Sequence, residues 1–198
     1  MRLVVDWDGT ITVRDSLVQV IHEFGDPALL AELEPRVGVD LTLHEEIALE
    51  FESITAPLDE VVGWVVENVQ VRPGLHELAA LRPLVISAGF HELIEPVLER
   101  EGVELEVLAN RVEARPDGWR VRFRDEAACA TCGEPCKRGS LAGEPYVYAG
   151  DGYSDRCAAL AADRVFARDA LAAHLDGLGV AYERFADLRD VASALRRS

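Results

Sequence analysis

Several polar residues stand where short apolar runs of the sequence end. If those runs are buried strands, such residues can reach a ligand, because open parallel sheets bind ligands beyond the carboxyl ends of their strands. A lysine just ahead of a predicted helix joins this group. The side chains that meet this description are Asp6, Asp8, Ser87, Lys137, Asp151 and Asp155.

The acidic members of this group predict phosphoryl chemistry assisted by a metal ion. Gathered in one crevice, Asp6 and Asp151 would repel each other strongly unless a cation joined them, and a small set of oxygen ligands suits Mg²⁺. A carboxylate such as that of Asp6 can attack phosphorus and form an aspartyl-phosphate. A second acid two residues on, Asp8, can protonate the leaving oxygen and then activate water.

Hydrogen-bond donors and one cation are available to hold a phosphate. The chain uses 19 Arg and a single Lys, and that lysine is Lys137, whose compact ammonium suits phosphate oxygens. Hydroxyls and backbone amides at strand ends and helix starts bind phosphate readily. The candidates for phosphate binding are therefore Thr10, Ser87, Ala88, Gly89 and Lys137.

The apolar pattern predicts the elements that bring these residues together. Turns and helices follow most of the predicted strands, and this alternation indicates an α/β fold, a Rossmann-like parallel sheet with helices on both faces. A hairpin is expected from 112–115 and 119–123 around a Pro-Asp-Gly turn. The other predicted strands are 2–6, 84–87, 105–108, 146–149 and 165–166.

One long helical segment interrupts the alternation directly after the first strand. Asp15-Ser16, Asp26-Pro27 and Thr42 are helix-start signals within it. We interpret residues 16–71 as a small α-helical cap, inserted into a catalytic core that consists of residues 1–15 and 72–198.

Composition limits the partners and the compartment. The 198 residues are 49% hydrophobic, which is enough apolar material for one domain with a modest insertion. A formal net charge of -16 repels nucleic acid and anionic lipid, and no apolar run is long enough to span a membrane. Because the N-terminus lacks a signal-peptide pattern, we expect a cytoplasmic protein that acts on a small phosphorylated metabolite. Its oligomeric state is left open.

Taken in order, these residues resemble the four motifs of the haloacid dehalogenase superfamily of phosphohydrolases. The sequence DWDGT at 6–10 fits the first motif, DxDGT, and GDGYSD at 150–155 fits the fourth. Ser87 and Lys137 match the second and third motifs. The resemblance covers nearly the whole chain.

This resemblance implies a role for each motif residue. Asp6 would be the nucleophile and Asp8 the general acid and base, while Ser87 and Lys137 would bind the phosphate. The Mg²⁺ ligands that the resemblance implies are Asp6, the carbonyl of Asp8, Asp151 and, directly or through water, Asp155.

The helical insertion resembles that of the phosphoserine-phosphatase-like branch, subfamily IB. Within this branch, the chain resembles the family of the methionine-salvage 2-hydroxy-3-keto-5-methylthiopentenyl-1-phosphate phosphatase. The residues that carry this likeness are 6–12 (DWDGTIT), Asn110-Arg111, Cys132 to Lys137 and 166–169 (FARD). It implies Mg²⁺-dependent hydrolysis of that enol phosphate. The cysteine-rich segment before Lys137 resembles that of the phosphocholine and phosphoethanolamine phosphatases, which implies an amino-alcohol phosphate instead. The alternatives are a phosphoserine phosphatase, a phosphotransferase or mutase on the same fold, and a non-catalytic ligand-binding scaffold.

The charge of the cap argues against a substrate that carries a carboxylate. No Lys or Arg occurs between Arg36 and Arg72, whereas the resemblance implies a cap arginine in phosphoserine phosphatases. A neutral, apolar or amine-bearing leaving group fits better. Asp15 and His44 are candidate substrate contacts, with a helix cap and a solvated helix position as their respective alternatives.

Three cysteines, Cys129, Cys132 and Cys136, precede Lys137. Their spacing resembles half of a zinc site, and only Cys157 or a histidine could supply a fourth ligand. Because the segment holds an incomplete ligand set, free thiols are the preferred interpretation and a structural Zn²⁺ is the alternative.

Overall fold

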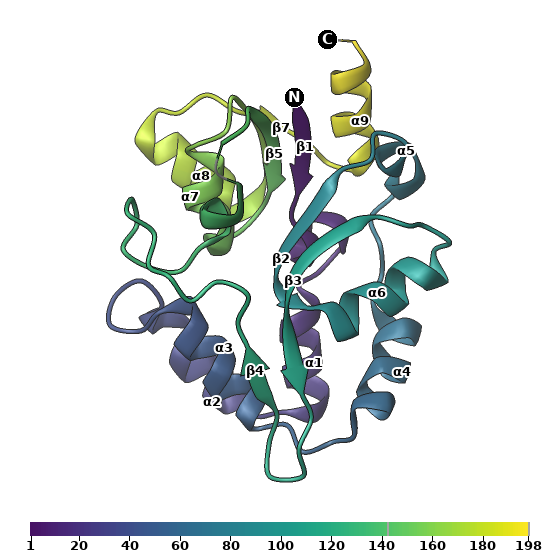
Figure 1. Ribbon diagram of the computed structural model, residues 1–198, viewed down its shortest axis with the longest axis vertical. Coiled ribbons are helices and arrows are strands. Elements are labelled where there is room, and N and C mark those ends of the chain that lie inside the picture. The colour runs from purple at the N-terminus through teal and green to yellow at the C-terminus, as the bar shows by residue number, and fades with distance from the viewer. Residues whose placement is uncertain (142, 198) are drawn as a thin grey trace.

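A seven-stranded sheet organises the protein in a computed structural model that describes residues 1–141 and 143–197 (Figure 1). The strands are β1 (Arg2–Val5), β2 (Leu84–Phe90), β3 (Glu106–Glu113), β4 (Arg120–Arg122), β5 (Tyr146–Gly150), β6 (Arg164–Ala167) and β7 (Glu183–Arg184). Their order is β4-β3-β2-β1-β5-β6-β7. Neighbouring strands run parallel except β4, which pairs antiparallel with β3.

Helices and short turns connect the strands. The α-helices are α1 (Ser16–Phe24), α2 (Pro27–Leu33), α3 (Leu43–Glu52), α4 (Leu58–Asn68), α5 (Leu75–Ala79), α6 (His91–Arg100), α7 (Arg156–Ala159), α8 (Asp169–Leu178) and α9 (Leu188–Arg196). The single turns are η1 (Trp7–Ile11), η2 (Glu34–Arg36), η3 (Lys137–Leu141) and η4 (Tyr153–Asp155).

Both faces of the sheet are covered, because side chains alternate along each buried strand. In β1, Leu3 and Val5 belong to the apolar cluster that includes residues of α5, α6 and α9. Val4 belongs to a second cluster, with residues of α7 and α8. The predicted fold class, a parallel α/β sheet with helices on both faces, is confirmed.

Helices α1 to α4 lie together at the lower end of the molecule, where the carboxyl end of β1 also points (Figure 1). Their buried residues, including Phe51 of α3 and Val61 of α4, belong to the same apolar cluster as the sheet residues. The β3–β4 connection is fastened to this region, because the Trp119 amide donates to the carbonyl oxygens of Phe51 and Ile54. The division into cap and core stays a prediction.

Several predicted boundaries were wrong. The strand at 105–108 and the first hairpin arm at 112–115 are one strand, β3, which pairs with β2 and then with β4. The sequence between them holds no turn signal. The strand predicted at 84–87 does not end there, because β2 continues through Ala88 and Gly89 to Phe90 with a register irregularity after Ile86. Strand β7 was not foreseen, since two exposed residues carry no periodic pattern.

No helix within the described part of the chain is both long and apolar enough to cross a lipid bilayer.

Candidate active site

Three segments that are distant in sequence meet at the carboxyl edge of the sheet. Asp6 follows β1, Lys137 begins η3, and Asp155 ends η4. Carboxylate oxygens of Asp6, Asp151 and Asp155 lie within 4.8 Å of one another. The structure therefore gathers the first, third and fourth motifs in one place.

Lys137 is the buried cation of this cluster. Its ammonium donates a hydrogen bond to Asp155 Oδ1 at 2.7 Å and another to Asp6 Oδ1. Burial alone would lower the pKa of the lysine, but Asp155 and Asp6 outweigh it and raise that pKa. The lysine is therefore held charged between two carboxylates, at 4% exposure.

Negative charge still exceeds positive charge around Lys137. Burial, reinforced by the negative charge of Asp155, raises the pKa of Asp6 well above its usual value even though Lys137 opposes the shift. Burial and Asp155 also raise the pKa of Asp151, to about 6. A further cation among these groups would relieve that repulsion.

The Asp151 carboxylate packs against Gly9 and Thr10. A Cβ atom on Gly9 would lie 2.2 Å from Asp151 Oδ2, and the φ of this glycine is +73°. Thr10 Oγ1 donates to Asp151 Oδ1 at 2.7 Å. The Thr10 hydroxyl thus orients Asp151, and its predicted contact with phosphate stays a prediction.

Both carboxylate oxygens of Asp155 accept hydrogen bonds from other groups of the protein. Oδ1 accepts from Lys137 and, at 2.6 Å, from the Tyr148 hydroxyl. Oδ2 accepts from the backbone amides of Asp151 and Gly152, each at 2.9 Å. This carboxylate is fully buried and shapes the loop that presents Asp151, which is a positioning role.

Asp8 points away from this cluster and toward the start of α1. Its Oδ1 accepts from the amide of Ser16 at 2.9 Å and from the Ser16 hydroxyl at 2.5 Å, and its Oδ2 accepts from Ser87 Oγ at 3.2 Å. Burial raises the pKa of Asp8, and the Ser16 hydrogen bonds counteract part of that rise. A carboxyl group with a raised pKa is suited to giving up and regaining a proton.

The predicted phosphate-binding segment lies inside β2, beside Asp8. The Gly89 amide donates to Ser87 Oγ at 2.8 Å. A Cβ on Gly89 would lie 3.1 Å from both Asp8 Oδ2 and Ser87 Oγ, so glycine permits this close approach. Ala88 lines the cavity that also contains Asp6 and Asp8.

Arg72 was missed by sequence reasoning, although it supports the loop after β1 directly. Its buried guanidinium donates to the carbonyl oxygens of Gly9 at 2.9 Å and Thr10 at 3.0 Å, and more weakly to those of Thr12 and Val13 at 3.3 Å. A lone arginine 60 or so residues from the loop gives no local signal of these tertiary contacts.

A cavity of about 460 Å³ extends from the catalytic edge to helices α1 to α3. We call it the acidic cavity, because the carboxylates that line it are Asp6, Asp8, Asp15, Glu34, Glu46, Glu50 and Asp151. Among its described lining residues, Arg156 is the one cation, and its guanidinium lies 4.5 Å from the centre of the Tyr153 ring.

The two predicted substrate contacts line different cavities. Asp15 lines the acidic cavity and also caps α1 by accepting from the Val18 amide. His44 stacks on Phe123 with ring centres 3.9 Å apart and lines a neighbouring cavity with Ser87 and Lys137. Burial lowers the pKa of His44, so it is a poor permanent cation. Both substrate contacts stay predictions.

The cluster fits Mg²⁺ chemically. Its donors are carboxylate oxygens in excess of their single ammonium partner, and the missing Cβ of Gly9 lets the Asp151 carboxylate lie close to the loop after β1. Since both oxygens of Asp155 are already hydrogen bonded, the groups that would hold the ion directly are Asp6, Asp151 and the carbonyl of Asp8.

Comparison with known proteins identifies the family. The model of the haloacid dehalogenase-like hydrolases matches residues 3–160, which contain all four motifs. The chain belongs to this family. The superfamily predicted from DWDGT, Ser87, Lys137 and GDGYSD is thereby confirmed.

Several proteins are similar to this chain over nearly its whole length. It is 25% identical to proteins named 2-hydroxy-3-keto-5-methylthiopentenyl-1-phosphate phosphatase in Bacillus cereus and Bacillus mycoides, over 99% of this chain and 96% of each relative. A substrate-bound phosphoserine phosphatase has a similar fold, with a TM-score of 0.71 at 16% identity, covering 98% of this chain and 97% of that one. The phosphoserine phosphatase of T. onnurineus gives 0.67 at 21% identity, covering 97% and 92%. The predicted enzyme class, a haloacid dehalogenase-type phosphatase, is confirmed.

Proposed function

We propose that the protein is a Mg²⁺-dependent phosphomonoesterase that hydrolyses a small phosphorylated metabolite through an aspartyl-phosphate on Asp6. The observation that carries this proposal is the meeting of Asp6, Asp151 and Asp155 with Lys137 at one edge of the sheet. We place the activity in the cytoplasm, where the four cysteines, which form no disulfide in the described structure, remain reduced.

The chemistry takes two displacements at phosphorus. A carboxylate oxygen of Asp6 forms a bond to phosphorus, the bond to the leaving oxygen breaks, and Asp8 gives that oxygen its proton. Asp8 then takes a proton from water, whose oxygen attacks the same phosphorus and breaks its bond to Asp6. Lys137 orients the Asp6 carboxylate throughout. When bound, Mg²⁺ supplies positive charge that offsets the charge of the phosphoryl group.

The first test measures phosphate released from a panel of phosphomonoesters in Mg²⁺, in EDTA, and by Asp6→Asn. Turnover should disappear in EDTA and in the variant, while the variant keeps the circular dichroism of the parent. Consumption of the phosphomonoester that needs an added alcohol acceptor, with the phosphoryl group recovered on that alcohol instead of as free phosphate, would indicate a phosphotransferase. An intact protein that turns over no member of the panel, with or without acceptor, would favour the ligand-binding scaffold.

A second observation bears on the substrate class. Glu50 is only 6% exposed, lines the acidic cavity, and has an Oε1 atom with no hydrogen-bond partner. Burial first, and then the charges of Glu46, Asp15 and Glu34, raise the pKa of Glu50 to about 8. A positively charged group in the cavity would supply the missing partner. We therefore favour an amino-alcohol phosphate over the methionine-salvage enol phosphate and over phosphoserine, which adds a carboxylate.

Matched substrates test this preference. Phosphoethanolamine and propyl phosphate have leaving groups of similar size and differ by an ammonium in place of a methyl. We expect phosphoethanolamine to have at least a tenfold higher kcat/KM, which is about 1.4 kcal/mol of transition-state discrimination, and Glu50→Gln to reduce that ratio. Phosphoserine and the methionine-salvage enol phosphate belong in the same series. Equal rates for the matched pair would exclude recognition of an amine.

A further inference from the structure

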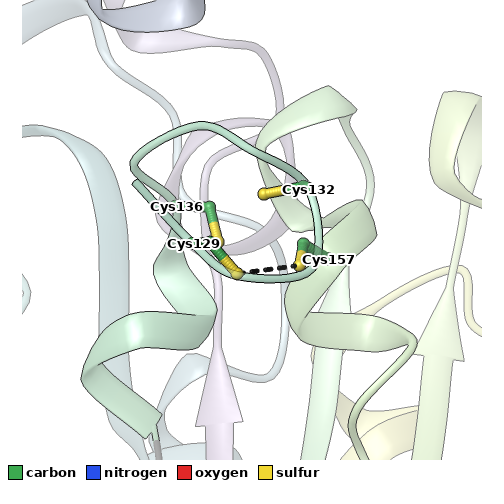
Figure 2. Close-up of side chains that lie close together, drawn as sticks. All are labelled: Cys129, Cys132, Cys136 and Cys157. Atoms are coloured by element: carbon green, nitrogen blue, oxygen red, sulfur yellow. Dashed lines mark hydrogen bonds between the residues drawn. The ribbon is translucent and has the colours of Figure 1, made fainter. Parts of the chain in front are cut away.

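The four cysteines of the chain converge on one point. Cys129, Cys132 and Cys136 come from the segment before η3, and Cys157 comes from α7 (Figure 2). Figure 2 shows their sulfur atoms turned toward a common centre, and all four lie within 4.8 Å of one another. The fourth ligand that the local spacing lacks is therefore supplied by tertiary structure.

The separation of the sulfur atoms fits a tetrahedral metal site. With zinc–sulfur bonds of about 2.3 Å, the sulfur atoms of a regular tetrahedron are about 3.8 Å apart. Cys129 Sγ and Cys157 Sγ lie 3.8 Å apart. A disulfide requires about 2.0 Å, so this arrangement places sulfur atoms at metal-ligand spacing rather than at bonding distance.

The backbone around Cys129 and Cys132 is folded in the way that thiolate ligands require. The amide of Thr131 donates to Cys129 Sγ at 3.4 Å, which is a hydrogen bond that stabilises a sulfur with negative charge. The turn closes when the Gly133 amide donates to the Cys129 carbonyl at 2.8 Å. Gly133 has a φ of +80°, which a side chain would disfavour.

We propose that Cys129, Cys132, Cys136 and Cys157 bind one structural Zn²⁺ ion. Four thiolates complete the tetrahedron and leave no open position, which is the coordination of a structural rather than a catalytic zinc. Soft sulfur ligands separate this site from the oxygen-lined Mg²⁺ site.

The position of the site gives it a consequence for the catalytic edge. Cys136 immediately precedes Lys137, and Cys157 follows Asp155 by two residues. The ion would therefore join the two segments that carry the 2.7 Å contact between Lys137 and Asp155. We assign the zinc a positioning role for Lys137.

The test is metal analysis of the full-length protein, purified without a histidine tag from zinc-supplemented cells. One zinc per chain is expected after gel filtration. Cys157→Ser and Cys132→Ser should lose it, whereas Ala130→Ser, in the same turn, should retain it. Asp6→Asn should also retain it, so zinc binding and phosphatase activity can fail separately.

Cobalt provides a readout that does not depend on how the variants fold. After zinc is removed from the parent protein, one equivalent of Co²⁺ should give the visible spectrum of a tetrahedral thiolate site, and Zn²⁺ should displace it. A thiol-reactive reagent should release zinc in step with modification of the four cysteines. The proposal is overturned if the parent protein contains no zinc and gives no tetrahedral cobalt spectrum. It is also overturned if folded Cys157→Ser keeps its full zinc content.

Discussion

The ammonium of Lys137 lies 2.7 Å from Asp155 Oδ1 and also contacts Asp6, and all three groups are buried. This triad joins the proposed nucleophile to the loop that presents Asp151. Replacing Lys137 by Met should leave two buried carboxylates without their cation and lower the free energy of unfolding by about 3–5 kcal/mol. Urea unfolding at pH 7 measures this loss, and Arg138→Met is the control. An unchanged free energy of unfolding would show that the buried carboxylates of Asp6 and Asp155 do not depend on the ammonium of Lys137.

Arg72 supports the part of the loop after β1 that follows the two proposed catalytic aspartates. Arg72→Met should leave the carbonyl oxygens of Gly9 and Thr10 without this buried donor and lower stability by about 2–4 kcal/mol. Phosphate release should fall as well, because Asp6 and Asp8 immediately precede these carbonyl groups in the chain. Arg115→Met breaks only an exposed ion pair and should change stability by less than about 1 kcal/mol. Equal effects of the two variants would contradict a special role for Arg72.

Ser16 couples the first helix after the catalytic loop to Asp8. Removing its hydroxyl in Ser16→Ala deletes the 2.5 Å hydrogen bond to Asp8 Oδ1, which favours the charged carboxylate. The pKa of Asp8 should rise, so the corresponding limb of the pH profile of kcat should move to higher pH. We expect a loss of about tenfold in kcat at pH 7, within the contribution of general acid–base catalysis. Ser193→Ala, on the exposed side of α9, is the control, and a pH profile that does not move would argue against this coupling.

Glu50 should make the protein less stable as the pH rises. Its folded pKa of about 8 exceeds the ordinary value of 4.5, because burial and then Glu46, Asp15 and Glu34 disfavour its charge. Between these two values the folded state binds more protons than the unfolded state, so the free energy of unfolding decreases from about pH 5 to pH 8. Glu50→Gln should remove part of this slope and stabilise the protein at pH 8 by about 1–2 kcal/mol, reduced by water in the cavity. The test measures the free energy of unfolding of the parent and of Glu50→Gln at pH 5 and pH 8, with the exposed Glu67→Gln as the control. If the decrease with pH is as large in Glu50→Gln as in the parent, Glu50 is not its source.

The motif residues could be predicted because each stands at a fixed place relative to an apolar run. Asp6 follows β1 and Asp151 follows β5, and parallel pairing of these two strands brings them together. Ser16 and Arg72 could not be predicted as supports, because their roles depend on hydrogen bonds to atoms whose positions are set by the whole fold. Cys157 shows the same limit, since its place beside Cys129 follows from packing of α7 rather than from spacing.

The apolar cluster that helices α1 to α4 share with the sheet has a consequence for how the molecule unfolds. Val61 and Val65 of α4 are buried in the cluster that also contains Ile94 of α6 and Val85 of β2. Neither part can expose its interior without disrupting the other, so both should melt in a single cooperative transition and protect their slowest-exchanging amides to the same extent. Ligands would then reach Asp6 through the acidic cavity, which Asp6 lines, while helices α1 to α4 stay packed on the sheet.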